Sequence, residues 1–193
     1  MKKDFKIFII ILFATIIIAG ALVFLVGFIF FASDHTYKGI DEIEKGHCIF
    51  NADILDNVGN YEDSYYQIHH KNMAIFSSDA SVLILKYNSE NYESEKKKLE
   101  DDYIFLDAPV KEEDGEDYLI SENEFAIDDW QFKVCRSDGW TEFEYPKYFR
   151  IIGYNEADNS IAYLDFDDSD LDIISESMEE FIDCYFDYDF RTK

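Results

Sequence analysis

The hydrophobic pattern of the chain begins with one long apolar segment. Residues Ile7 to Ala32 contain no charged side chain and only one polar side chain, Thr15. A helix of about 20 apolar residues crosses the hydrocarbon core of a bilayer, so this segment is long enough to span a membrane. We therefore predict a tail at residues 1–6 and a transmembrane signal anchor at residues 7–32.

Lysines on either side of the anchor predict its orientation. Lys2, Lys3 and Lys6 precede the apolar segment, whereas Lys38 and Lys45 are the nearby basic residues that follow it. Basic residues are enriched on the cytoplasmic side of single membrane spans. We expect a single-pass protein of the cell membrane, with a cytoplasmic N-terminus and its C-terminal domain outside.

A cleaved signal peptide is the competing interpretation of the same segment. Ala19-Gly20-Ala21 has the small residues of a cleavage site, but cleavage there would leave an apolar N-terminus. The apolar segment is also longer than the roughly 7–15 residues that are typical of a signal peptide. We favour an uncleaved anchor.

The remaining chain alternates between strand and helix patterns. The apolar, β-branched segment at residues 82–87 predicts a buried strand. Alternating apolar and polar residues predict a β-meander, with strands at 130–135, 140–145, 148–154 and 161–166.

Two later segments have helical spacing of their apolar residues. They are residues 92–103 and residues 173–186, and Ser169 with Asp172 could cap the start of the second helix. Residues 33–60 and 65–76 have no clear pattern. We predict an α+β fold for residues 61–193, with a mostly antiparallel sheet and two helices on one of its faces, preceded by a juxtamembrane segment at residues 33–60.

The charge of the domain restricts its partners. The chain has a net charge of −25, and residues 1–33 contribute none of this excess because they carry three Lys and one Asp. So acidic a domain repels phosphate backbones, which excludes nucleic acid as a partner. A protein partner should be cationic or neutral.

Aromatic residues make up 18% of the chain, which is too many for a disordered tail. Tyrosines are favoured both at interfaces and on ordinary sheet surfaces, and we favour the second explanation. The tyrosines that exceed what a hydrophobic core must hold are Tyr65, Tyr66, Tyr145, Tyr148, Tyr154, Tyr163, Tyr185 and Tyr188.

Cys48, Cys135 and Cys184 are far apart and odd in number. This spacing forms neither a disulfide framework nor a metal or redox pair. A bridge between Cys135 and Cys184 stays open from the sequence, and buried thiols are the favoured state.

An acidic segment contains the one pattern that indicates a metal. Asp165, Asp167, Ser169 and Glu176 place oxygen ligands at positions 1, 3, 5 and 12 of a loop, as calcium loops do. Position 6 of such a loop is normally Gly, and here it is Asp170. The competing interpretation is a strand that leads into a helix whose N-terminus favours negative charge.

No motif for catalysis or for a tightly bound cofactor is found. The histidines His35, His47, His69 and His70 lack the spacing of a zinc site. The nucleophile and phosphate-binding motifs are missing from the sequence as well. We therefore assign no catalytic and no cofactor-binding residue.

We expect a membrane-tethered, non-catalytic extracytoplasmic protein for binding or interaction. One alternative is a membrane-bound enzyme whose site is assembled from residues scattered along the chain, and another is a calcium-responsive surface domain. Only three of the 17 basic residues are Arg, which suggests an AT-rich bacterial genome.

Overall fold

The computed structural model describes residues 2–31, 33–49, 51–73, 76–111, 118–136, 148–168 and 177–191. Its helices are α1 (Lys2–Phe31), α2 (Asp41–Glu44), α3 (Asn51–Asn57), α4 (Ser89–Asp102) and α5 (Met178–Tyr185). Its strands are β1 (Ser33–Lys38), β2 (Asp63–Met73), β3 (Phe76–Lys86), β4 (Val110–Lys111), β5 (Tyr118–Ile120), β6 (Glu124–Ile127), β7 (Trp130–Val134), β8 (Tyr148–Asn155) and β9 (Ser160–Asp168). The structure confirms the α+β fold.

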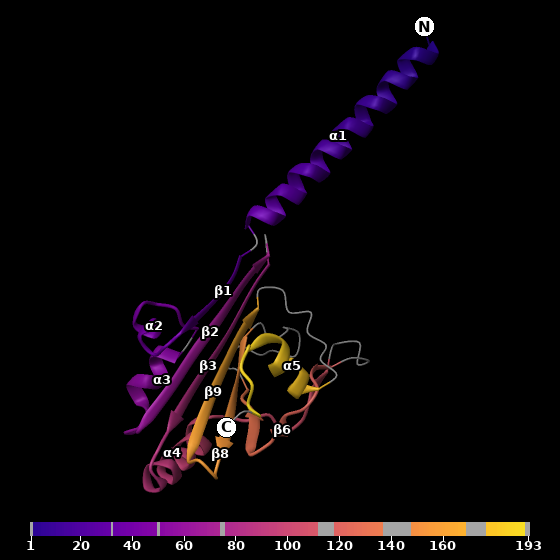
Figure 1. Ribbon diagram of the computed structural model, residues 1–193. Helices are drawn as coiled ribbons and strands as arrows, with labels where there is room; N and C mark the ends of the chain where they lie inside the picture. Colours follow the sequence, from indigo (N-terminus) through magenta and orange to yellow (C-terminus); the bar gives the residue numbers. More distant parts are fainter. Residues whose placement is uncertain are drawn as a thin grey trace.

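The N-terminal apolar segment forms one helix of 30 residues, α1. Within it, Lys6–Val26 is long and apolar enough to cross a membrane, and none of this part is buried. In Figure 1, α1 extends away from the sheet instead of packing on it. The helix is therefore a candidate membrane span, and an N-terminal signal sequence would have the same features.

Seven strands form one sheet in the order β1-β2-β3-β9-β8-β7-β6. Each strand is antiparallel to its neighbours, so the predicted antiparallel sheet is confirmed. After β3 the chain crosses to the far edge, and β6 to β9 return from there to the centre. The pairing of β3 with β9 closes the sheet, while β4 and β5 pair separately.

Both faces of this sheet are covered by helices, which corrects the prediction that the helices lie on one face. Val82 and Ile84 of β3 belong to the core under α5, whereas Leu83 and Leu85 belong to the core under α4. Successive residues of a strand point to opposite faces, so a strand buried on both sides must be apolar throughout. This explains the uninterrupted apolar sequence of β3 from Val82 to Leu85.

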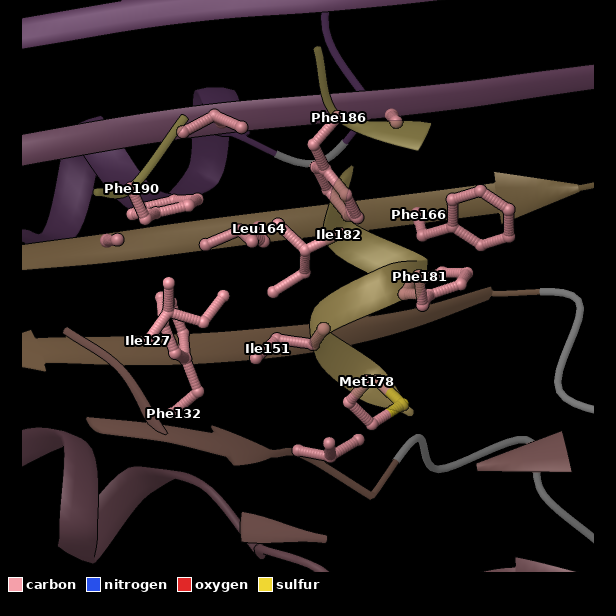
Figure 2. Packing of buried hydrophobic residues seen from close by; sticks show 14 of the residues in the cluster. Ile127, Phe132, Ile151, Leu164, Phe166, Met178, Phe181, Ile182, Phe186 and Phe190 are labelled. Carbon is pink, nitrogen blue, oxygen red and sulfur yellow. The ribbon is translucent and has the colours of Figure 1, made fainter. Parts of the chain in front are cut away.

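Helix α5 covers one face through Met178, Phe181 and Ile182, all of which are buried. Figure 2 shows these side chains packed over Ile151 of β8 and Phe166 of β9. The rings of Phe166 and Phe181 meet edge to face, with centroids 5.0 Å apart. Burial of each such side chain contributes about 1.5–3 kcal/mol, so this contact fixes a short helix that would not be stable alone.

The other face is covered by α2, α3 and α4. Ile43, Ile54 and Leu99 from these three helices are buried against it. Tyr66 and Tyr163, which were among the tyrosines in excess of a core, are buried here too. These tyrosines therefore serve as core residues, and Tyr145 lies outside the described residues.

The strands predicted at 148–154 and 161–166 are β8 and β9, and the strand predicted at 130–135 is β7. The strand predicted at 82–87 is β3, which starts earlier, at Phe76. The strand predicted at 140–145 lies outside the described residues.

The predicted helix at 92–103 is α4, which starts earlier because the Asn88 side chain accepts a hydrogen bond from the backbone N–H of Asn91. The predicted helix at 173–186 is α5, which the side chain of Ser177 caps by accepting from the N–H of Glu180. Ser169 and Asp172, the cap predicted from the sequence, lie outside the described residues.

Residues 33–60 contribute to the sheet domain in addition to connecting it to α1. They form edge strand β1 and the short helices α2 and α3, which the pattern does not predict. Residues 63–73 form β2. Its Gln67 can be buried because the side-chain amide donates to the carbonyl oxygens of Phe186 and Asp187. Contacts with distant segments thus explain why the pattern here is unclear.

Gly153 is required where β8 passes under a phenyl ring. A Cβ atom at this position would lie 2.4 Å from Cε1 of Phe132 and 3.3 Å from Cβ of Ala162. We predict that Gly153→Ala destabilises the domain by about 1–3 kcal/mol, because Phe132 and Ala162 are packed in the core and have no room to move away from the added methyl group. Urea unfolding of the full chain in detergent micelles measures this difference.

Gly59→Ala is the matched control, because its Cβ would meet only Glu95 Oε2, at 3.5 Å. We expect it to change the free energy of unfolding by less than about 0.5 kcal/mol. Equal stability of the Gly153→Ala variant and the unaltered chain would contradict the packing described for β8.

Candidate functional site

The face of the sheet under α4 changes from apolar to charged along its strands. In the pairing of β8 with β9, Ile152 lies opposite Tyr163, and the next pair on the same face is Arg150 with Asp165. The side chain of Asp165 is fully buried and that of Arg150 is 11% exposed. A charged pair thus lies in the middle of the sheet instead of at its rim.

Arg150 and Asp165 form a two-pronged ion pair. Arg150 Nε donates to Asp165 Oδ1 at 2.6 Å, and Nη2 donates to Oδ2 at 3.0 Å. Burial alone would lower the pKa of Arg150, but the charge of Asp165 and the hydrogen bond to it raise that pKa above its usual value. The guanidinium group is therefore charged at any physiological pH.

Two tyrosines hold this pair in place. The Tyr148 hydroxyl donates to Asp165 Oδ1 at 3.1 Å, and Arg150 Nη1 donates to the Tyr103 hydroxyl at 2.6 Å. Burial raises the pKa of both tyrosines, so both hydroxyls keep their protons at neutral pH. Side chains from three elements therefore fix the orientation of the guanidinium plane.

A cavity of about 460 Å³ lies over Arg150, between the sheet and helices α3 and α4. We name it the α3–α4 cavity. Its lining residues are Asp53, Ile54, Asn57, Val58, Glu95, Lys98, Leu99, Asp102, Tyr103, Arg150 and Tyr163. This volume falls within the range of small-molecule sites, about 300–1,000 Å³.

Three hydrogen bonds hold the walls of the α3–α4 cavity together. Glu95 is only 5% exposed and accepts from the backbone N–H of Gly59 at 3.1 Å. Lys98 donates to the carbonyl oxygen of Asn57 and to Glu95. Because these contacts tie the end of α3 to α4, the cavity is largely preformed.

The guanidinium group of Arg150 has donors left for a ligand. Arginine carries five N–H donors, and the bonds to Asp165 and Tyr103 use three of them among the described residues. Arg150 also lines a smaller cavity of about 330 Å³, which shares Asp102 and Tyr103 with the first and to which Arg136 contributes. The remaining donors thus lie where an anionic group could enter.

Cys135 is the one thiol among the described residues of these two cavities. Cys135 lines the smaller cavity, and burial raises the pKa of its thiol. A reactive cysteine needs the opposite shift, towards the thiolate. At neutral pH the Cys135 thiol therefore stays protonated, and the described residues of the site present donors and charges in fixed positions.

The structure describes two of the four residues predicted to bind calcium, Asp165 and Asp167, both in β9. Asp165 would have to leave Arg150 to join a metal site, whereas Asp167 lies two residues further along β9, opposite Asp79. Burial, Asp79 and Asp168 raise the pKa of Asp167, in that order of importance. Ser169 and Glu176 lie outside the described residues, so the calcium site remains a prediction.

Histidines gather near the start of β1, away from the α3–α4 cavity. His70 Nδ1 lies 2.6 Å from Asp79, and the ring of His47 stacks on Tyr37 at 4.0 Å. Neither of the two cavities around Arg150 is lined by a histidine. Among the described residues, no group of three His, Cys, Asp or Glu side chains has the geometry to hold a metal ion.

All three cysteines are free thiols. Cys135 is buried on the face under α4, while Cys184 is exposed on α5, which covers the opposite face. The bridge between these two cysteines that the sequence left open is therefore not formed.

The sequence did contain a signal for Arg150. It is a lone basic residue in the predicted strand 148–154, and Asp165 stands at the matching distance beyond the turn of the same hairpin. Antiparallel register would have placed these two side chains opposite each other. Tyr103 directly follows α4 and lies outside this hairpin, so hairpin register could not have identified it.

Comparison with protein-family models, curated proteins and solved structures found no match. The geometry of the site is therefore the basis for a functional proposal.

The ion pair of Arg150 with Asp165 can be tested through the stability of the domain. Arg150→Met and Asp165→Leu should each destabilise the domain by about 3–5 kcal/mol, because each leaves one buried charge without its partner. The double variant should lose much less than the sum of the two. Urea unfolding of the four proteins measures the coupling between the two residues.

Lys96 and Glu156 are the matched control pair, with an Nζ–Oε1 distance of 2.7 Å at the surface. Their coupling, measured with Lys96→Met and Glu156→Gln, should be below about 1 kcal/mol. Additive losses at Arg150 and Asp165 would contradict the described ion pair.

Proposed function

We propose that this chain is a membrane-tethered, non-catalytic binding protein whose ligand is a small zwitterion of the amino-acid type. The observation that carries the proposal is Arg150, a guanidinium group fixed by Asp165 and Tyr103 at the floor of a preformed cavity. Its remaining N–H donors suit the carboxylate of a ligand, since guanidinium and carboxylate groups match in shape and charge.

The charges of the cavity wall favour a ligand with a positive end as well. Glu95 is bound to Lys98, whereas Asp53 and Asp102 are exposed carboxylates at the opening. A ligand amine would neutralise them while its carboxylate reaches Arg150. A purely anionic ligand would meet these carboxylates as well as the general negative charge of the protein.

Binding is favoured over catalysis by the protonation of the site. Burial raises the pKa of Cys135 and Tyr103, so neither is a base or a nucleophile at neutral pH. The other charged groups are paired or exposed. These features support recognition of a molecule without its conversion.

Membrane attachment is the second part of the proposal. The length and composition of α1 support a membrane anchor, and the three lysines that precede its apolar part support a cytoplasmic N-terminus. The sheet domain, which follows α1, would then lie outside the cytoplasm and bind its ligand there.

Protease digestion tests the orientation. We predict that a protease added to intact cells that express the chain removes the sheet domain while cytoplasmic marker proteins survive. Digestion only after the cells are lysed would show the reverse orientation.

Ligand binding is tested by thermal unfolding of the full chain in detergent with each of the common L-amino acids. We predict that at least one raises the melting temperature, and that its amide derivative, which lacks the carboxylate, does not. At about a hundredfold excess over Kd, binding adds about 2.7 kcal/mol to the stability.

Two variants of α3 locate the site. Asn57 lines the α3–α4 cavity and is exposed, so Asn57→Trp should obstruct the opening and abolish the shift. Asp56 is exposed and is not a lining residue, so Asp56→Trp should preserve the shift. The proposal fails if no amino acid stabilises the chain, or if the stabilisation persists in Asn57→Trp.

A further inference from the structure

A second cavity, of about 420 Å³, is lined by residues of the opposite face and of the turns that follow β6 and β8. The turn between β8 and β9 lies at the end of the sheet far from α1 (Figure 1). Two hairpin turns and the C-terminal segment after α5 form the walls of this cavity. Its lining residues are Ile84, Asp128, Asp129, Trp130, Asn155, Ala157, Asp158, Ser160, Tyr188, Phe190 and Arg191. We name it the Trp130 cavity.

Three aromatic rings form one corner of the Trp130 cavity. The ring of Phe190 stands nearly perpendicular to Trp130, at 77° with centroids 5.4 Å apart, and to Tyr188, at 67° and 4.6 Å. Trp130 is 8% exposed and Phe190 is 4% exposed, so packing holds both in place. The cavity therefore has aromatic walls in more than one plane.

Carboxylates surround these rings. Asp128 and Asp129 form the two-residue turn between β6 and β7, and Asp158 lies in the turn between β8 and β9, bound to Lys86. All three carboxylates line the cavity and are exposed to solvent. They give the opening of the cavity an excess of negative charge.

Arg191 is the basic residue among the described lining residues, and nearby carboxylates already neutralise its charge. It binds Glu179 at 2.5 Å, Asp183 at 2.9 Å and Asp189 at 3.4 Å. Three carboxylates therefore outweigh one guanidinium group at this side of the cavity. An anionic ligand would be repelled, while a cation would be attracted.

We propose that the Trp130 cavity binds an organic ammonium group, with a quaternary ammonium as the best fit. The negative faces of aromatic rings attract such a cation, and carboxylates add long-range attraction. The apolar methyl groups of a quaternary ammonium also suit aromatic walls, which the strong hydration of an inorganic cation does not. This site is separate from the α3–α4 cavity and does not depend on the function proposed there.

Choline and its neutral analogue 3,3-dimethyl-1-butanol, which have the same shape, provide the test. The reporter is the fluorescence of Trp130 in the full chain in detergent, with Trp140→Phe to leave Trp130 as the sole tryptophan. We expect a saturable change with choline, and binding about tenfold weaker for the alcohol because it lacks the charge.

Variants on both kinds of wall accompany this titration. Asp128→Asn removes one exposed carboxylate without touching the core, and Tyr188→Leu removes one ring; each should weaken choline binding several-fold. Asp56→Asn, which removes a carboxylate from α3 on the other face, should leave choline binding unchanged. Asn57→Trp should leave it unchanged as well, which separates this result from the α3–α4 cavity.

Equal affinity for choline and the alcohol would overturn the proposal, since it would show an apolar pocket without preference for charge. No saturable signal with choline would overturn it too. Choline binding that is unaffected by both Asp128→Asn and Tyr188→Leu would place the cation elsewhere and would have the same consequence. Melting curves of each variant confirm that the loss is not due to unfolding.

Discussion

The pairing of β3 with β9 is the contact on which the rest of the structure depends. It joins the N-terminal strands β1 to β3 to the returning strands β6 to β9, and thereby makes one sheet from two parts of the chain. Both faces of this sheet carry apolar side chains that must be buried. Helices α2 to α4, which precede β9 in the chain, cover one face, and α5, which follows β9, covers the other. Without this long-range pairing, neither face would be wide enough to hold a core or a cavity.

The strands that the pattern predicts well are those with local partners. β8 and β9 form a hairpin, and their alternation and turn residues are visible within a short segment. β1 and β2 are harder to predict, because they contain buried polar residues such as Gln67, whose hydrogen-bond partner lies more than a hundred positions away in the chain. The distribution of helices over both faces also depends on the β3–β9 pairing, which no local pattern contains.

The candidate site shows the same division between local and distant contacts. Arg150 and Asp165 meet through hairpin register, so the sequence contains enough to pair them. The contact of Arg150 with Tyr103 joins residues 47 positions apart, and the cavity exists only because α3 and α4 pack beside each other. The sequence predicts Asp165 as a metal ligand, and in the structure its carboxylate accepts two hydrogen bonds from Arg150.

Charge is used differently on the two faces of the sheet. Under α4, one ion pair is taken out of water, and its geometry is restricted by tyrosines that stay protonated. At the Trp130 cavity, the carboxylates stay in water and the rings are buried instead. One sheet therefore offers a directional donor site on one side and a diffuse negative field over aromatic walls on the other.

The junction between α1 and the sheet has a consequence for how far the domain can travel. Only residue 32 separates the end of α1 at Phe31 from the start of β1 at Ser33. Proteins that sample the space above a membrane do so through long flexible linkers, whose reach grows with the square root of their length. Under the proposed topology, this domain has almost no such reach. It would stay next to the bilayer and bind only molecules that come within one domain length of the membrane surface.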